Sequence, residues 1–363
     1  MTDDHAPAAL SLSDSEIGGS IDLPAMTDEL LLAFADLGSG TAVSTLRVRA
    51  QLDDLDVSAM SAYYPRRSVG GGKLYVNSPR GRGFIIVLFA DDGQLLASFS
   101  GSVITAARTA ATTGIGVRLL APPDSHTAAL FGTGEQASWL AQVLMQEMDL
   151  RDLRIVGRSQ HKADALAHWA TSNGIPARVT DAHTAITDAD VVVTATAAYE
   201  PAFDGYWLTE GALVVGVGST KPYRQELDLK TVRRASLIGS DSAQGATTEA
   251  GDPIHAAEHD GFAWSRVVGL GGLVSKGVIV WSRRRPKDTT LQDRRRGDIH
   301  SRTRKSGRPY DAFKVEFRLG HERHQPPRRG NDRHDGQGRL FQPGVGDGQT
   351  RTAPLREMGD KWS

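Results

Sequence analysis

The sequence predicts an α/β protein in which a Rossmann-type dinucleotide-binding domain follows an N-terminal α/β domain, with an aberrant basic tail at the C-terminal end. Three observations support this fold class. Strand and helix patterns alternate along the middle of the chain, a glycine-rich turn joins the first such strand to the first such helix, and the apolar periodicity ends at about Trp281. The 363 residues are enough for two ordinary domains.

The segment before the alternating region contains its own helices and strands. Ser13–Glu16 has the spacing of a capping box and predicts the start of a short helix. Thr27–Leu37 predicts an amphipathic helix, which Gly38 is expected to end. A buried strand, a second strand after an Asp-Gly turn, and an Ala-rich helix are then expected over 84–89, 94–99 and 105–120.

The alternating pattern that follows is typical of a parallel sheet. Strands are predicted over 127–131, 153–156, 177–179, 191–196, 213–217 and 237–238, and helices over 135–148 and 162–172. All strands of this sheet are therefore expected before residue 240.

Composition excludes several classes of protein. The chain has no cysteine, which rules out disulfides, a thiolate zinc site and a cysteine nucleophile. The longest apolar runs have the length of strands, so no membrane span is expected. The first basic residue is Arg47, and the acidic segment before it resembles neither a signal peptide nor a transit peptide. We expect a cytoplasmic protein.

The near-neutral total charge, 42 Lys and Arg against 43 Asp and Glu, hides a basic tail. Residues 283–363 carry 21 basic and 11 acidic side chains, and only 15 of these 81 residues are apolar. Such a segment cannot bury much of a core, and we expect it to be largely disordered. A basic extension that binds nucleic acid is the alternative, but the overall charge does not favour that partner.

A dinucleotide fingerprint lies between the first strand and the first helix of the alternating region. Its G-x-G-x-x-A pattern is formed by Gly132, Thr133, Gly134, Glu135, Gln136 and Ala137. The first glycine permits a tight turn, the second lets the backbone approach a pyrophosphate, and the alanine lets the helix pack close to the strand. The free N–H groups at the start of the helix then bind phosphate.

The end of the second strand indicates which dinucleotide binds. An NAD site requires an acidic residue there, for the ribose 2′-hydroxyl. This chain has Arg158 and Ser159 instead, with Lys162 nearby, and these side chains can bind a 2′-phosphate. We expect NADP(H) to be preferred over NAD(H).

The chain resembles the ornithine cyclodeaminase/mu-crystallin family over roughly residues 10–275. The matching blocks, in order, are 70–75, 105–111, the fingerprint, 192–196, 217–219, 226–228 and 249–252. The resemblance implies a subunit of two domains, usually dimeric, that holds an amino acid or imino acid between an N-terminal domain (1–120) and a Rossmann domain (121–282). It also implies cofactor contacts from the strand-end blocks, namely Thr194, Ala195, Thr196, Val217, Gly218 and Ser219.

The resemblance also implies the residues that meet the substrate. Lys73 in the G-G-K block, Arg49 before it and Arg108 in the T-x-x-R-T block match the family's positions, with Arg47 as a rival to Arg49. The chemistry agrees, because an arginine can bind a carboxylate through two hydrogen bonds and a lysine can exchange a proton with the substrate nitrogen.

One departure from the family pattern bears on the reaction. Cyclodeaminases have an aspartate after the V-G strand, and this chain has Thr220 there. A threonine hydroxyl cannot act as a general base near neutral pH. An NAD(P)-dependent oxidoreductase acting at the α-carbon of a small amino or cyclic imino acid is therefore preferred. Ornithine cyclodeaminase and a non-catalytic, mu-crystallin-like protein that binds NADPH remain as alternatives.

The tail departs from the family as well, because the family continues with a segment of the kind L-F-K-[ST]-x-G. Leu291–Arg295 reads L-Q-D-R-R instead. If those residues are encoded CTT-CAA-GAC-CGT-CGG, reading one base later gives Phe-Lys-Thr-Val-Gly. A frameshift between about residues 265 and 290 is thus a second hypothesis for the tail.

Two further motifs are not assigned a function. His255–His259 fits the H-x-x-E-H pattern of an inverted zinc-protease signature, but no third ligand is indicated, and we expect a solvated helix face and no metal. Gly70–Lys73 lacks the first glycine and the Ser/Thr of a phosphate-binding loop.

Overall fold

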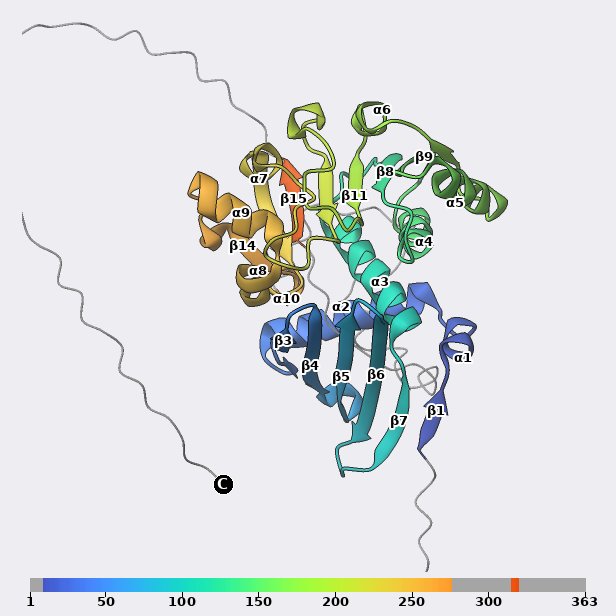
Figure 1. The fold of residues 1–363 in the computed structure, drawn as a ribbon, viewed down its shortest axis with the longest axis vertical. Coiled ribbons are helices and arrows are strands. Elements are labelled where there is room, and N and C mark those ends of the chain that lie inside the picture. Colours follow the sequence, from blue (N-terminus) through green and yellow to red (C-terminus); the bar gives the residue numbers. More distant parts are fainter. Residues whose placement is uncertain (1–8, 276–314, 320–363) are drawn as a thin grey trace, which may run out of the picture. The chain divides into compact units, whose positions relative to one another are not determined.

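The computed structural model describes residues 9–275 and 315–319, which form two β-sheets and their helices (Figure 1). The first sheet contains β1 (Leu10–Leu12), β2 (Val43–Ser44), β3 (Val48–Leu52), β4 (Leu55–Tyr64), β5 (Val69–Ser78), β6 (Gly81–Ala90) and β7 (Leu95–Ser100). The strand order is β1-β7-β6-β5-β4-β2, with β3 also paired to β4. Its helices are α1 (Asp14–Gly18), α2 (Leu23–Ser39) and α3 (Ser102–Leu120).

The strand register of the first sheet sorts its side chains onto two faces, because successive residues point to opposite sides. Lys73 stands in one row with Met60 and Ile86, all three of which are buried. Leu74, the next residue, stands in a row with Ile85 on the opposite face, where both are exposed. One face of the sheet is therefore covered and the other carries exposed apolar side chains.

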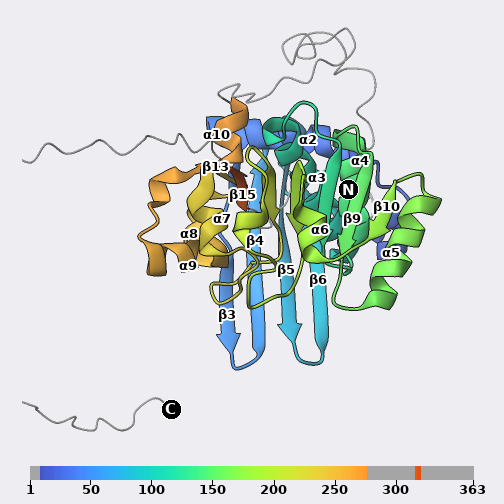
Figure 2. The ribbon, with the colours of Figure 1, turned by 90° about the horizontal axis from the view of Figure 1, so that it is seen from above.

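The second sheet follows along the chain, and Figure 2 shows it from above. Its strands are β8 (Thr127–Phe131), β9 (Asp152–Val156), β10 (Ala177–Val179), β11 (Val191–Thr194), β12 (Leu213–Gly216), β13 (Ala235–Ser240), β14 (Val267–Gly269) and β15 (Val315–Leu319). Its helices are α4 (Ala137–Glu147), α5 (Gln160–Ser172), α6 (Ala182–Ile186), α7 (Leu229–Arg234), α8 (Ala243–Glu249), α9 (Gly251–Asp260) and α10 (Leu270–Ser275).

The strand order of this sheet confirms the Rossmann prediction. The order is β10-β9-β8-β11-β12-β15-β13-β14, and the first five strands are parallel. If β8, the strand before the glycine-rich turn, is counted as strand 1, the five strands have the spatial order 3-2-1-4-5. The order reverses between β8 and β11, and dinucleotides bind at this point in folds of this kind. Alternate residues of β8, β11 and β12 enter two different buried apolar clusters, one on each face.

The expectation that all strands of this sheet precede residue 240 is wrong. β14 and β15 lie beyond it, and β15 is antiparallel to both β12 and β13, between which it is inserted. The segment Val315–Leu319 reads V-E-F-R-L, an alternation of apolar and charged residues that the low average apolar content of the tail concealed. Five residues of the tail thus form a strand, and the other residues for which disorder is expected lie outside those described.

Some helix ends follow the sequence signals and others differ from them. The helix predicted from Thr27 begins four residues earlier, at Leu23, where the Asp22 carboxylate accepts the Ala25 N–H, and α3 begins at Ser102, before the predicted residue 105. The capping box at Ser13 is present, and its hydroxyl accepts the Glu16 N–H. However, α2 continues past Gly38 and ends at Gly40, which is left-handed (φ +76°). Gly38 serves a close approach instead, because a Cβ atom there would lie 2.0 Å from the Gly271 carbonyl oxygen of α10. No helix within 9–275 is long and apolar enough to cross a membrane.

The helix α3 leads from the first sheet to the second (Figure 1). Every residue from Ala106 to Val117 is buried. Because α3 is enclosed along this length, it fixes where Thr105 and Arg108, near its start, lie relative to the strands of the first sheet.

Candidate functional site

The glycine-rich turn after β8 has the geometry that the fingerprint predicts. Gly132 has φ +117°, and a Cβ atom there would lie 2.4 Å from the Ala195 carbonyl oxygen, so only glycine fits. Gly134 is exposed, and a Cβ atom there would meet nothing within 4 Å. The backbone at Gly134 is thus open to a ligand.

Two further features show that the turn fits a dinucleotide. No side chain caps α4, which leaves the N-terminal end of the helix open to an anion, although the Ala137 N–H itself donates to the Gly134 carbonyl oxygen at 3.0 Å. The Oε1 atom of Gln136 is buried and has no hydrogen-bond partner in the described part of the chain. A buried acceptor of this kind suits a ligand hydroxyl. Thr133 and Glu135 complete the turn, and Ala137 is buried where α4 begins.

The end of β9 presents basic and hydroxyl groups. Arg158 and Ser159 are exposed, two and three residues after the strand ends at Val156. The Ser159 hydroxyl accepts the N–H of Lys162 at 3.5 Å as the cap of α5, which leaves its own hydrogen free to be donated. No acidic residue stands between Val156 and Lys162.

The ends of β11 and β12 are joined by a buried carboxyl group that the sequence motifs did not identify. Glu226 is fully buried and accepts hydrogen bonds from Thr194, Thr196 and Gly218. These are three of the residues expected to contact the cofactor. The available signal in the sequence was the glutamate of the E-L-D block. Its burial shows its importance, because glutamate is seldom fully buried unless it is paired. Ala195 and Val217 belong to the same two strand ends.

A second buried acid, Asp252 on α9, supports the same region. Its Oδ1 atom accepts the backbone N–H groups of Glu226 and Leu227 at 2.8 and 3.0 Å. Ser219 is tied to the same helix, because its hydroxyl accepts the Asp252 N–H at 3.2 Å and donates to the Arg224 carbonyl oxygen. The loop after β12 is therefore fixed at several points.

Lys73 lies on the covered face of the first sheet. It is 5% exposed, and its Nζ atom donates a hydrogen bond of 2.7 Å to the Thr105 hydroxyl. The Nζ atom also lies 5.3 Å from the centroid of the Tyr75 ring and 4.8 Å from that of Phe84. These aromatic faces stabilise an ammonium group away from bulk water.

Arginine residues gather near this lysine. Arg108 is 4% exposed and stands three residues after Thr105 on α3, so both residues lie on one face of the helix. Arg49 reaches Glu249 of α8 at 3.7 Å. Arg47 forms a closer ion pair with the same carboxylate, and its guanidinium lies 5.7 Å from the Tyr75 ring centroid. Arg47 is therefore as well placed as Arg49, which the sequence comparison preferred.

The loop after β12 also reaches the first sheet. The Lys221 ammonium lies 3.3 Å from the buried Asp56 carboxylate of β4. Burial alone would raise the pKa of Asp56, but the Asn77 amide and the charge of Lys221 bring that pKa below its usual value. Thr220, the residue before Lys221, is half-buried in this loop, and its N–H donates to the Gly218 carbonyl oxygen.

The structure thus brings the predicted residues together as two groups. The cofactor group lies at the carboxyl edge of the second sheet, and the cationic group lies on the covered face of the first. Two contacts join them, from Arg47 and Arg49 to Glu249 and from Lys221 to Asp56. No role was predicted from the sequence for Glu249, Asp56 or Lys221.

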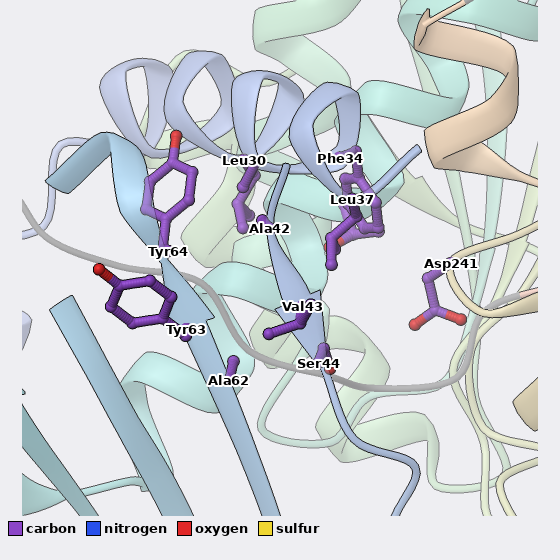
Figure 3. Close-up of a pocket in the computed structure, with 12 residues that line it drawn as sticks. Leu30, Phe34, Leu37, Ala42, Val43, Ser44, Ala62, Tyr63, Tyr64 and Asp241 are labelled. Carbon is purple, nitrogen blue, oxygen red and sulfur yellow. The ribbon is translucent and has the colours of Figure 1, made fainter. Parts of the chain in front are cut away.

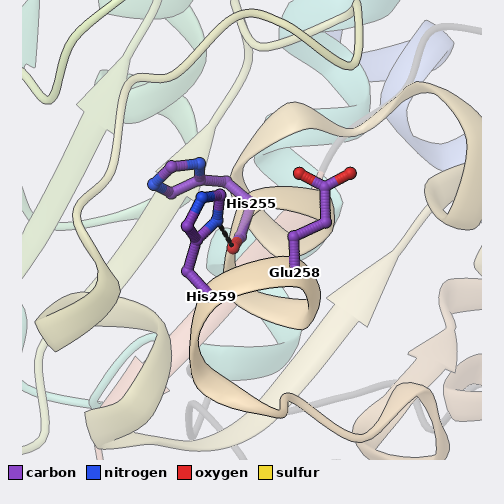
Figure 4. Close-up of side chains that lie close together, drawn as sticks. All are labelled: His255, Glu258 and His259. Carbon is purple, nitrogen blue, oxygen red and sulfur yellow. Dashed lines mark hydrogen bonds between the residues drawn. The ribbon is translucent and has the colours of Figure 1, made fainter. Parts of the chain in front are cut away.

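The H-x-x-E-H segment lies on α9, where candidate ligand atoms of His255, Glu258 and His259 are within 4.8 Å of one another (Figure 4). The Nδ1 atom of His259 is engaged with the His255 carbonyl oxygen at 2.9 Å. No fourth ligand joins this cluster among the described residues, and we assign no metal to it.

An apolar pocket lies between α2, β2 and β4 (Figure 3). Its lining includes Leu30, Phe34, Leu37, Val43, Tyr63 and Tyr64. None of its lining residues belongs to the predicted site, so it plays no part in the reaction considered below.

Comparison with known proteins finds similar proteins both among curated sequences and among solved structures. Ketimine reductase mu-crystallin of Mus musculus is 34% identical over 176 residues, which are 48% of this chain and 55% of the relative. The chain thus matches about half the length of that curated relative. A crystal structure of a probable ornithine cyclodeaminase from Bordetella pertussis Tohama I superposes with a TM-score of 0.69 and 32% identity, over 75% of this chain and 86% of the other.

A second solved structure is the Delta(1)-pyrroline-2-carboxylate reductase of Thermococcus litoralis in complex with NADH and L-proline. Its TM-score is also 0.69, with 25% identity over 74% of this chain and 87% of the other. The profile of the ornithine cyclodeaminase/mu-crystallin family matches residues 9–293, which is most of the sequence and extends beyond the region where the resemblance is apparent by eye. The chain therefore belongs to the ornithine cyclodeaminase/mu-crystallin family.

Proposed function

We propose that the chain is an NADP(H)-dependent oxidoreductase that acts at the α-carbon of a small amino acid or cyclic imino acid. One observation supports this most strongly. The buried Lys73 of β5 is bonded to Thr105 of α3, and the buried Arg108 lies one turn later on the same face of that helix. The same chain has a second sheet whose carboxyl edge fits a dinucleotide. The names of the relatives, a ketimine reductase and a pyrroline-2-carboxylate reductase, agree with this reaction class.

Each cationic residue has a role in this proposal. Arg108 and Arg49, with Arg47, bind the substrate carboxylate, because paired N–H groups match its two oxygens. When bound, the nicotinamide cofactor supplies hydride chemistry at the α-carbon. Lys73 holds the proton that the imine nitrogen gains in reduction and takes it back in oxidation. The proton and the hydride together convert the C=N bond to an amine, so the step balances.

We propose the cofactor residues from the same geometry. The pyrophosphate would be held by the turn formed by Gly132, Thr133, Gly134, Glu135, Gln136 and Ala137. The nicotinamide half would be held by the strand-end residues Thr194, Ala195, Thr196, Val217, Gly218 and Ser219. Arg158 and Ser159 favour NADP(H) over NAD(H), since both are exposed at the end of β9 and can bind a 2′-phosphate.

A homodimer is the proposed assembly, with residues 1–120 as the substrate and dimerisation domain and 121–282 as the cofactor domain. Val48, Leu74 and Ile85 lie in one row across the exposed face of the first sheet and are 70%, 47% and 45% exposed. An apolar row of this kind suits a second copy of the chain. Leu74→Asp is expected to reduce the mass measured by light scattering, whereas Met145→Asp, at an exposed position of α4, leaves it unchanged.

Ornithine cyclodeaminase is the second candidate, since one similar structure is that of a probable ornithine cyclodeaminase. Thr220 argues against it, because a hydroxyl cannot act as the base in ring closure. Incubation with ornithine, followed by assays for ammonia and proline, tests the cyclodeaminase. Oxidation of NADPH in the presence of a cyclic imino acid tests the reductase. A protein that binds NADPH but is inactive in both assays is instead the non-catalytic, mu-crystallin-like protein.

A further inference from the structure

Glu226 uses every acceptor position of its carboxylate. Oε1 accepts the N–H and the hydroxyl of Thr196 at 2.5 and 2.6 Å, and Oε2 accepts the Thr194 hydroxyl and the Gly218 N–H at 3.0 and 2.6 Å. All four donors belong to the ends of β11 and β12. One buried side chain therefore holds together the two neighbouring strand ends.

The backbone around this carboxylate is packed too closely to reposition itself without it. A Cβ atom at Gly218 would lie 1.9 Å from the Thr196 carbonyl oxygen and 2.7 Å from Oε1 of Glu226. The Gly132 turn is close to Ala195 at the same strand end, because a Cβ atom added at Gly132 would lie 2.4 Å from the Ala195 carbonyl oxygen. The strand ends of β8, β11 and β12 are thus in direct contact.

The pair formed by Glu226 and Asp252 carries negative charge without a basic partner. Within the described residues, their hydrogen-bond donors are backbone N–H and hydroxyl groups only. Burial, with the charge of Glu226 as a second cause, raises the pKa of Asp252 to about 8. Burial raises the pKa of Glu226 as well, but its four hydrogen-bond donors favour the ionised carboxylate and oppose that rise. Asp252 accepts fewer hydrogen bonds, so we assign the proton of the pair to Asp252 and the negative charge to Glu226.

The position of this charge matters for a dinucleotide. In a sheet of this order, the adenosine half lies over the strands on one side of the reversal point and the nicotinamide half over those on the other. β11 and β12 are the strands of the nicotinamide side. The nicotinamide ring is cationic when oxidised and neutral when reduced, so a carboxylate beneath its binding surface stabilises the oxidised form selectively.

We propose that Glu226 is a positioning residue for the nicotinamide half of the cofactor, and that its charge favours binding of NADP⁺ over NADPH. The proposal rests on the proposed function, since it requires a dinucleotide at this edge. It assigns Asp252 the task of holding the Glu226 backbone while staying neutral.

The test compares dissociation constants for NADP⁺ and NADPH, measured by calorimetry on the full chain. In Glu226→Gln, we expect NADP⁺ binding to weaken about three- to tenfold more than NADPH binding, as the loss of one nearby charge implies. Glu226→Asp keeps the charge but shortens the side chain, so both constants are expected to rise together. Asp252→Asn keeps the acceptor for both backbone N–H groups, and we expect the parental ratio of the two constants at about pH 6.5.

A second measurement keeps the proposal testable if Glu226→Gln does not fold. Above pH 8, ionised Asp252 adds a second charge to the parent chain but not to Asp252→Asn, so the parent is expected to gain relative affinity for NADP⁺. The charged and titratable groups on α9 itself and on the elements packed against it are Lys221, Tyr223, Arg224, Glu226, Asp228, Lys230, Arg233, Arg234, Glu249, His255, Glu258, His259 and Asp260. Of these, Glu226 is the one whose charge raises the pKa of Asp252. Both cofactor forms carry the same phosphates, and the comparison of the parent with Asp252→Asn removes the effect of other groups that titrate in both chains.

The outcomes distinguish failure of the proposed function from failure of the role assigned to Glu226. No binding of either dinucleotide to the parent chain would overturn the proposed function. Binding with an unchanged ratio in Glu226→Gln, or the same ratio at about pH 9 in the parent and in Asp252→Asn, would overturn the assignment to Glu226 alone.

Discussion

The Lys73 ammonium donates a hydrogen bond of 2.7 Å to the hydroxyl of Thr105, a half-buried residue that lies 32 positions later in the sequence, in the first turn of α3. The Thr105 hydroxyl in turn donates to the Gly101 carbonyl oxygen. Since a hydroxyl has one hydrogen, this second bond obliges Thr105 to act as acceptor toward Lys73. Lys73 therefore uses one of its N–H groups as the donor in this hydrogen bond.

The first prediction concerns Lys73. Lys73→Met keeps a similar apolar stem and removes the ammonium, so the reduction rate is expected to fall about 10²–10⁴-fold if Lys73 transfers the proton. The dissociation constant for NADPH, measured by calorimetry, is expected to stay near that of the parent, because Lys73 belongs to the other sheet. A variant that turns over at the parental rate would show that Lys73 has no role in proton transfer.

The second prediction concerns cofactor choice. Arg158→Ala is expected to lose most of the preference for NADPH over NADH, because charge-assisted hydrogen bonds to the 2′-phosphate contribute about 1.5–3 kcal/mol, or roughly one to two decades in dissociation constant. Arg151→Ala is the matched control, an exposed arginine paired with Asp149 before β9. Equal dissociation constants for the two cofactors in the parent chain would refute the assignment of NADP(H).

The third prediction uses the pKa of Asp252, which burial raises from 3.8 to about 8. Between these values the folded chain binds more protons than the unfolded chain, so the free energy of unfolding decreases as pH rises through that range. Asp252→Asn removes this proton uptake, and its stability is expected to fall less than that of the parent between about pH 5 and pH 8.5. Urea unfolding at both pH values gives the free energy of unfolding of each chain. The same change in that free energy with pH in the parent and in Asp252→Asn would contradict the raised pKa.

The fourth prediction concerns the contact between α2 and α10. Gly38→Ala places a Cβ atom against the Gly271 carbonyl oxygen at 2.0 Å, and overpacking of this kind costs about 1–3 kcal/mol of folding free energy. Gly18→Ala is the control, because its Cβ atom meets Val103 at an ordinary 3.6 Å. Thermal unfolding of both variants gives the comparison. Equal melting temperatures would show that the two helices separate at little cost.

The fifth prediction concerns the gene. The family profile ends at residue 293, next to Leu291–Arg295, where a shifted frame yields the family's Phe-Lys segment. We expect its codons to give Phe-Lys-Thr-Val-Gly one base later. Sequencing of this region decides the matter, and codons that cannot give that reading would remove the frameshift hypothesis.

Local sequence signals predicted the second sheet well and the first sheet poorly. The parallel strands β8, β11 and β12 are continuous apolar runs between helices, a pattern that a single sequence shows clearly. In the first sheet, β5 begins with three glycines after Val69, and the buried positions of β4 include the polar residues Asp56 and Ser58. Such strands have weak intrinsic propensity and depend on their neighbours.

The same limit applies to the candidate site. The glycine-rich turn has a local pattern and is identifiable from spacing. Glu226 and Asp252, in contrast, come together through contacts between segments 26 residues apart. Their burial, which gives them their significance, is a property of the tertiary structure. Arg47 and Arg49 are two residues apart, which places both side chains on the same side of an extended segment. That both reach one carboxylate follows from the position of Glu249, which the sequence does not show.

The most direct measurement follows the fate of the hydride. NADPH that carries deuterium at the transferable position of the nicotinamide is incubated with the chain and a small cyclic imino acid, and the product is analysed by mass spectrometry. The account predicts a cyclic amino acid with one deuterium at the α-carbon, formed as NADPH is consumed and lost in Lys73→Met. Product without deuterium, or ammonia and proline formed from ornithine while cyclic imino acids are left unchanged, would contradict it.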